Sequence, residues 1–277
     1  MMDWLYRVRV FPDFDPTLLQ IGPLAIRWYA LAYIGSLVLG WQIVRRLVRL
    51  SPTVATAEQT DDFLTWATLG VVLGGRLGYV LFYQPSRFLA EPLQIFAVWE
   101  GGMSFHGGAL GVVVALVLFC RQRGIPLLGF ADRIAVVTPM GLGFGRLANF
   151  INGELWGRPA PDGVPFRMVF PRVDMVPRYP SQLYQALMEG LILLVTLALL
   201  ARSEAVRARF GMLTGVFLVG YSIARSTGEL FRQPDAFLGF LFAGATMGQL
   251  LSVPMAVAGL WLIMRARPRR VETAVLS

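Results

Sequence analysis

The sequence contains no lysine and only one histidine and one cysteine among its 277 residues, so all 25 basic residues are arginine. A single cysteine, Cys120, excludes an internal disulfide and a cysteine-based metal cluster. One histidine and one cysteine cannot supply a zinc ligand set by themselves, and we expect neither a metal nor another cofactor. Charged residues make up only 15% of the chain and hydrophobic residues 56%, whereas roughly a quarter of the residues in soluble proteins are charged. This composition predicts a membrane protein.

Seven apolar stretches are each long enough to cross roughly 30 Å of hydrocarbon as a helix. They cover residues 24–44, 63–83, 104–120, 134–151, 183–201, 210–231 and 246–264. Continuous apolar runs without two-residue alternation favour helices over a β-barrel. We therefore expect an all-α polytopic membrane protein: a single domain over 1–277, with a bundle of seven transmembrane helices and a non-helical cap at about 152–182, where prolines gather. The first 22 residues are charged and lack an apolar core, so we expect no cleaved signal peptide.

The arginines near the expected spans predict how the chain is oriented. One side collects thirteen of them in short loops and the tail: Arg45, Arg46, Arg49, Arg121, Arg123, Arg133, Arg202, Arg207, Arg209, Arg265, Arg267, Arg269 and Arg270. The positive-inside rule makes that side cytoplasmic, with the N-terminus and the cap outside and the C-terminus inside. Because the net charge of +8 lies beside membrane spans, we expect anionic lipid as a partner and no nucleic acid.

Three arginines lie inside expected spans, where a charge is costly and by default marks a functional site. At about 1.5 Å per residue, Arg146 and Arg225 lie roughly 20 and 22 Å from the cytoplasmic ends of their spans, and Arg76 about 10 Å below the outer end. All three positions fall in the outer half of the bilayer. Their planar guanidinium groups suit a lipid phosphate. The alternative is ion pairing alone, of Arg225 with Glu229 or of Arg146 with Glu154.

Three polar residues within the expected spans or at their outer ends are further candidates. His106, the only histidine, heads the third span beside two glycines and suits a general base, or it is simply a satisfied polar residue. Asn149 follows Arg146 by three residues and shares its helix face, to contact the same ligand or only a neighbouring helix. Tyr29 at the outer end of the first span fits an interfacial aromatic belt or the site itself.

The run GRLANFINGELWGRP at 145–159 closely resembles the signature of the prolipoprotein diacylglyceryl transferases. Supporting runs in the same order extend over nearly the whole chain: IGPLAIRWYAL at 21–31, LGGRLGYVLFY at 73–83, WEGGMSFHGG at 99–108, RYPSQLYQALMEG at 178–190 and ELFRQPD at 229–235. The resemblance implies an enzyme of the bacterial inner membrane, with its active site towards the periplasm. Its partners would be phosphatidylglycerol and prolipoprotein signal peptides with a lipobox cysteine.

The resemblance also implies a reaction and a set of residues. The cysteine thiol attacks the glycerol carbon of phosphatidylglycerol, which gives a thioether and releases glycerol 1-phosphate. The family positions associated with activity or substrate binding correspond to Tyr29, His106, Arg146, Asn149, Glu154, Gly157 and Arg232, and Arg76 joins the substrate-binding set because of its depth. Whether His106 removes the thiol proton, or an arginine lowers the thiol pKa enough, stays open at this point.

In the implied site, Arg146 and Arg232 hold the departing phosphate. Glu154 orients an arginine or assists proton transfer, Asn149 binds polar oxygens, and Gly157 allows a tight loop. A transporter is the main alternative, but it would favour broken helices and repeated halves, which the sequence does not show. A serine protease using Ser104 and His106 fails because residues two apart do not face each other on a helix.

Overall fold

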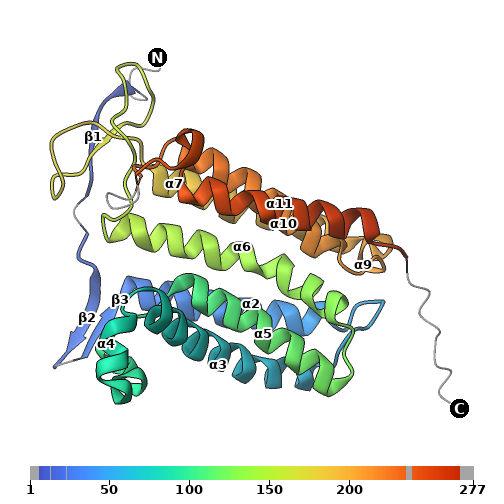
Figure 1. Ribbon diagram of the computed structural model, residues 1–277. Coiled ribbons are helices and arrows are strands. Elements are labelled where there is room, and N and C mark those ends of the chain that lie inside the picture. Colours follow the sequence, from blue (N-terminus) through green and yellow to red (C-terminus); the bar gives the residue numbers. More distant parts are fainter. Residues whose placement is uncertain (1–5, 13, 23, 235–238, 269–277) are drawn as a thin grey trace, which may run out of the picture. The chain divides into compact units, whose positions relative to one another are not determined.

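The computed structural model describes residues 6–12, 14–22, 24–234 and 239–268, and most of them are helical (Figure 1). Parts of the segments considered above lie outside the described residues: residues 1–5 and 13 of the charged N-terminal region, Pro23 and Asp235 of the quoted runs, and Arg269 and Arg270 of the basic tail.

Within the described residues, five helices are long and apolar enough to cross a membrane. They are α3 (Ala57–Phe82), α5 (Phe105–Arg123), α6 (Leu127–Ile151), the continuous helix Ser181–Arg202 and α11 (Met247–Arg265). This result fits a multi-pass membrane protein and matches five of the seven expected spans. Helices α2 (Trp28–Leu47) and α10 (Met212–Glu229) lie at the other two positions, and the seven-span bundle itself stays a prediction.

The chain divides into two compact units, residues 43–133 and residues 1–42 with 134–277, and the single-domain organisation stays a prediction. In the first unit, α3 and α5 are in backbone contact along a row of glycines. A Cβ atom on Gly74 would lie 2.8 Å from the Cα of Gly111, and one on Gly107 would lie 2.9 Å from the Cα of Gly78. Small residues at this spacing let membrane helices approach closely. The two helices are joined by α4 (Pro85–Ala90), η1 (Pro92–Phe96) and η2 (Val98–Glu100).

In the second unit, α10 and α11 pack side by side (Figure 1), again with glycines in contact. The helix Ser181–Arg202 comprises α7 (Ser181–Gln185), the π-helical segment η3 (Ala186–Ile192) and α8 (Leu193–Arg202). Its π-helical segment crosses α6 where Gly190 meets Gly143: a Cβ on Gly190 would lie only 2.6 Å from the Cα of Gly143. The first part of α2 also packs on α6, since a Cβ on Gly40 would lie 3.5 Å from Val137 Cγ2. Small helices α9 (Glu204–Arg207) and η4 (Phe242–Gly244) complete the unit.

The cap is built from extended segments that pair with one another, and residues 152–180 contain no helix, as expected. Strand β1 (Arg9–Val10) runs parallel to β4 (Met168–Val169). Isolated bridges extend this pairing from Met168 to Arg178, from Arg178 to Pro159, and from Gly157 to Arg232. Beneath it, Phe11 stacks on Phe170. The cap therefore ties the end of α10 to the segment that follows α6. Strands β2 (Thr17–Ile21) and β3 (Leu24–Arg27) form a separate hairpin.

Candidate active site

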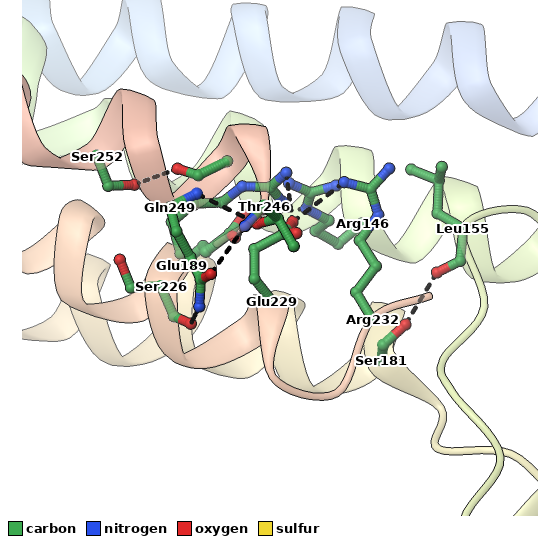
Figure 2. Close-up of polar contacts among 12 residues, drawn as sticks. Arg146, Leu155, Ser181, Glu189, Ser226, Glu229, Arg232, Thr246, Gln249 and Ser252 are labelled. Carbon is green, nitrogen blue, oxygen red and sulfur yellow. Dashed lines mark hydrogen bonds and ion pairs between the residues drawn. The ribbon is translucent and has the colours of Figure 1, made fainter. Parts of the chain in front are cut away.

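Three arginines and two glutamates form a buried ion cluster in the unit that contains residues 1–42 and 134–277 (Figure 2). Arg146 on α6 donates from Nε to Glu189 Oε2 on η3 at 3.0 Å. Arg225 Nη2 on α10 lies 2.7 Å from Glu229 Oε1, and Arg232 Nη1 lies 3.1 Å from the same oxygen. The two carboxylates are 0% and 2% exposed. Among the described residues, this cluster joins three guanidinium groups and two carboxylates.

The glutamates are held between arginines and by the start of α11. Glu189 Oε1 lies 3.6 Å from Arg225 Nη1, so Arg225 connects the two carboxylates. The side chain of Thr246, the N-cap of α11, lies beside that of Glu229 and accepts a hydrogen bond from the backbone N–H of Gln249. The positive end of the α11 dipole therefore faces Glu229. Gly248 makes this approach possible, because a Cβ there would lie 3.0 Å from both Arg225 Nε and Glu229 Cδ.

Arg146 keeps donors available for a ligand. Its Nε is committed to Glu189, but its Nη1 and Nη2 donate no hydrogen bond to any described residue, and its side chain is 15% exposed. Asn149, one turn further along α6, is buried, and its side-chain amide likewise has no hydrogen bond among the described residues. Two guanidinium donors and one amide on the same helix face can bind an anionic group with polar oxygens.

The ion pairs differ in part from the pairs that spacing suggested. Arg225 does pair with Glu229, as the alternative interpretation proposed. The suggested pairing of Arg146 with Glu154 is wrong: the partner is Glu189, and the exposed Glu154 accepts a hydrogen bond from Asn152 Nδ2 at 3.2 Å. Glu189 was missed, although a carboxylate inside an apolar stretch was as clear a signal as the arginines. The role predicted for Glu154 in activity stays a prediction.

Arg158 is a second residue that sequence reasoning missed. Its Nε donates to the backbone oxygen of Arg232 at 2.9 Å and its Nη2 to that of Glu229 at 3.0 Å. Its guanidinium carbon also lies 5.1 Å from the centre of the Phe240 ring. A cation bonded to the last carbonyls of a helix stabilises that end. Arg158 therefore fixes the end of α10, from which Arg232 and Glu229 enter the cluster.

Gly157 occupies a place where two backbone segments leave no room for a side chain. Its N–H donates to the Tyr179 oxygen at 3.0 Å, and a Cβ would lie 2.7 Å from the Phe231 oxygen. Because Gly157 pairs with Arg232, its lack of a side chain helps to place that arginine. Direct contact of Gly157 with substrate stays a prediction.

Arg76 belongs to the other unit, and backbone carbonyls hold it. Its Nε donates to the oxygen of Ile95 at 2.9 Å, its Nη1 to those of Gly101 at 2.5 Å and Gly102 at 3.3 Å, and its Nη2 to that of Gln94 at 2.5 Å. The residue is 5% exposed. These contacts clamp the loop before α5, so they give Arg76 a structural function. Its predicted part in substrate binding stays untested.

His106 and Tyr29 each lie in the first turn of a helix. His106 follows Ser104, whose Oγ accepts a hydrogen bond from the N–H of Gly107 at 3.2 Å, and its exposed ring meets that of Phe105 edge-on. The Tyr29 hydroxyl lies 3.2 Å from that of Tyr33. His106 belongs to one unit, and Tyr29 and Arg146 to the other, so their convergence stays a prediction. Among the described residues, no group of three or more His, Cys, Asp or Glu could hold a metal ion.

Comparison with known proteins decides the family. Residues 16–265 match the family model of prolipoprotein diacylglyceryl transferase. The chain belongs to this family. It is 62% identical over 265 residues to the phosphatidylglycerol–prolipoprotein diacylglyceryl transferase of Gluconacetobacter diazotrophicus, covering 95% of both chains. The enzymes of the same name from Acidiphilium cryptum and Gluconobacter oxydans are 60% and 58% identical, over 94% and 96% of this chain and 95% and 98% of theirs.

The match to this family confirms the resemblance that the quoted runs indicated, and it means that the chain is a transferase. The family model covers all the predicted site residues, from Tyr29 to Arg232, together with Glu189 and Arg225. The buried cluster therefore lies entirely within the part of the chain that matches this transferase family.

Proposed function

We propose that this chain transfers the diacylglyceryl group of phosphatidylglycerol to the lipobox cysteine thiol of prolipoproteins. The buried cluster carries this proposal, because its three guanidinium groups and the available Nη donors of Arg146 suit a lipid phosphate. The high identity to named transferases over nearly the full chain supports it. The reaction would be the first step of lipoprotein maturation.

In the proposed reaction, the thiol sulfur attacks the glycerol carbon that carries the phosphate. A C–S bond forms as the C–O bond breaks, and the electron pair of that bond passes to the phosphate oxygen. Arg146 and Arg232 stabilise the charge that develops there. Asn149 binds polar oxygens of the headgroup. The thiol proton leaves either to His106 or directly from a thiol whose pKa a nearby arginine lowers.

We also propose that the chain lies in the bacterial inner membrane as seven spans, with its cap and active site towards the periplasm. The accumulation of arginine in the loops on the opposite side supports this orientation. It places the N-terminus outside and the C-terminus in the cytoplasm. A lipid phosphate of the outer leaflet would then reach the cluster from the side of the cap.

The reaction is tested by incubating the purified protein with phosphatidylglycerol and a lipobox peptide, followed by mass spectrometry. We expect the peptide to gain one diacylglyceryl group without added metal or nucleotide. A peptide with serine in place of the cysteine should remain unmodified. If the wild-type protein leaves the cysteine peptide unchanged, the proposed function is wrong.

Arg146→Ala should lower transfer at least about 100-fold, because one charged donor to the developing oxyanion is lost. Membrane insertion should be retained, since α6 keeps its apolar length. Arg123→Ala is the matched control: Arg123 forms a half-exposed pair with Asp62 at 2.8 Å in the other unit, and its loss should leave transfer intact. Full activity of Arg146→Ala would remove this arginine from the site.

A further inference from the structure

The turn that carries Glu154 has an unusual main chain. Leu155 has a φ angle of 53°, in the left-handed region that residues with a Cβ rarely adopt. On the other side of Glu154, Gly153 has a φ angle of 68°. A strained residue persists only where the surrounding structure holds it in place. The conformation of Leu155 therefore indicates that contacts from outside the turn fix the path of the chain at Glu154.

Two side chains from the first turn of the helix Ser181–Arg202 supply these contacts. Ser181 Oγ donates to the backbone oxygen of Leu155 at 2.9 Å (Figure 2), and Gln182 Nε2 donates to that of Glu154 at 2.6 Å. Ser181 is 0% exposed and Gln182 1%. The Gln182 amide oxygen is also buried, and it accepts no hydrogen bond from a described residue. An unsatisfied buried oxygen is costly, so the bond to Glu154 sets the orientation of this amide.

The rest of the turn is anchored on both sides. The Glu154 N–H donates to the Asn149 oxygen at 2.9 Å, near the end of α6. Phe150 before the turn and Trp156 after it pack on the buried core of the cap. In contrast, the Glu154 side chain is exposed, and among the described residues its carboxylate accepts a hydrogen bond only from Asn152. A fixed main chain with an available carboxylate suits a group that contacts a ligand.

We propose that Gln182 is a positioning residue for Glu154, and that together with Ser181 it fixes the turn from which this carboxylate reaches the substrate. The inference rests on the proposed function and adds two residues to its site. An ionised carboxylate only accepts hydrogen bonds, so the ligand group must be a donor, either a headgroup hydroxyl or the lipobox thiol. The main-chain bond to Asn149 places the turn at the end of the helix that also carries Arg146.

The position of the contact separates this role from a purely structural one. Gln182 bonds the main-chain oxygen of residue 154, which any amino acid at this position presents. Glu154→Gln therefore keeps the bond and removes only the ionised carboxylate. Gln182→Met keeps the length of the side chain and removes the donor. If Gln182 acts through the carboxylate, losing the bond impairs transfer only while the carboxylate is present, whereas it lowers stability in either case.

The experiment is a double-mutant cycle of Gln182→Met and Glu154→Gln, measured by peptide diacylation and by thermal unfolding in detergent. Alone, Gln182→Met should lower kcat/KM at least about tenfold, because a small misplacement of a functional group slows a reaction strongly. In the Glu154→Gln background, it should lower kcat/KM less than about twofold. The Tm should fall equally in both backgrounds, because the same buried oxygen loses its donor.

Gln59→Met is the matched control, since Gln59 Oε1 accepts a hydrogen bond from the Thr56 N–H at 2.9 Å in the other unit. This variant should lower the Tm and leave kcat/KM unchanged. If Gln182→Met does not fold, Ser181→Ala takes its place in the cycle, and Glu154→Asp replaces Glu154→Gln where transfer falls below detection.

The outcomes distinguish this inference from the proposed function. Losses of transfer that multiply across the cycle, or a fully active Glu154→Gln, overturn the inference while the wild type transfers diacylglycerol normally. A wild type that leaves the lipobox peptide unmodified refutes the proposed function and, with it, the role of Gln182.

Discussion

Gly190→Ala tests whether the crossing of α6 and η3 sets the geometry of the ion cluster. Gly190 follows Glu189 directly, and Gly143 precedes Arg146 by three residues, so both partners of the ion pair lie next to the crossing point. A Cβ on Gly190 would lie 2.6 Å from the Cα of Gly143 and 3.2 Å from its nitrogen. Both contacts are with backbone atoms, which cannot rotate away as a side-chain tip would.

The size of the effect follows from these distances. Carbon atoms in contact prefer about 3.5–4.0 Å, so the helices must separate by about 1 Å. The 3.0 Å bond between Arg146 Nε and Glu189 Oε2 would then exceed hydrogen-bonding distance. Overpacking costs about 1–3 kcal/mol, partly offset by about 0.5–1 kcal/mol for replacing a helical glycine with alanine. A misplacement of 1 Å at a catalytic group can lower the rate about 100-fold, so activity should fall far more than stability.

The assay pairs thermal unfolding in detergent with peptide diacylation followed by mass spectrometry. Gly141→Ala, two residues before Gly143 on α6, is the control: its Cβ would meet Ser36 Oγ at an ordinary 3.8 Å, and both stability and transfer should stay near wild type. If Gly190→Ala transfers diacylglycerol within about threefold of wild type, the close crossing does not set the geometry of Arg146.

Two further predictions concern other parts of the chain. Arg76→Gln should lower the free energy of unfolding by more than about 2 kcal/mol, because buried carbonyls lose charged donors. Limited proteolysis should then cut within residues 91–102. Arg76→Lys should not restore the stability, since an ammonium lacks the planar fork of a guanidinium. In the cap, the hydrogen bonds from Arg178, together with the N–H of Val176, hold the pKa of the Asp174 carboxyl below its ordinary value of 3.8. Because this folded-state pKa is lowered, the Asp174 carboxylate stabilises the cap above the ordinary value, and that stabilisation is lost as the pH falls through the folded pKa. The protection of the Val176 amide against hydrogen exchange should therefore fall below about pH 4 in the wild type. In Asp174→Asn this protection should be low and independent of the titration.

The sequence predicted the five helices that are long and apolar enough to cross a membrane, and two arginines of the buried ion cluster, because long apolar runs and isolated charges within them are local signals. Arg146 and Arg225 were found in this way, and Arg232 by resemblance. The partner of Arg146 was not predictable from spacing along its own helix, since Glu189 comes from another helix and meets it only through the Gly143–Gly190 crossing.

Depth along a span likewise did not reveal what an arginine binds. Arg76 and Arg146 looked equivalent by this measure. In the structure Arg76 donates to four backbone oxygens, whereas the two Nη groups of Arg146 bind no described residue. The difference depends on how the loop after α4 folds back, and that loop has no periodic pattern from which its path could be predicted.

The way Arg76 holds its loop has a consequence for how the sequence can diverge. Its donors recognise main-chain oxygens, which every amino acid presents, so the identities of Gln94 and Ile95 can change without loss of these bonds. Gly101 and Gly102 are different, because their φ angles of 83° and 76° strain any other residue. Substitutions in related chains should therefore be common at positions 94 and 95 and rare at positions 101 and 102. The path of the loop backbone should be more conserved than its amino-acid sequence.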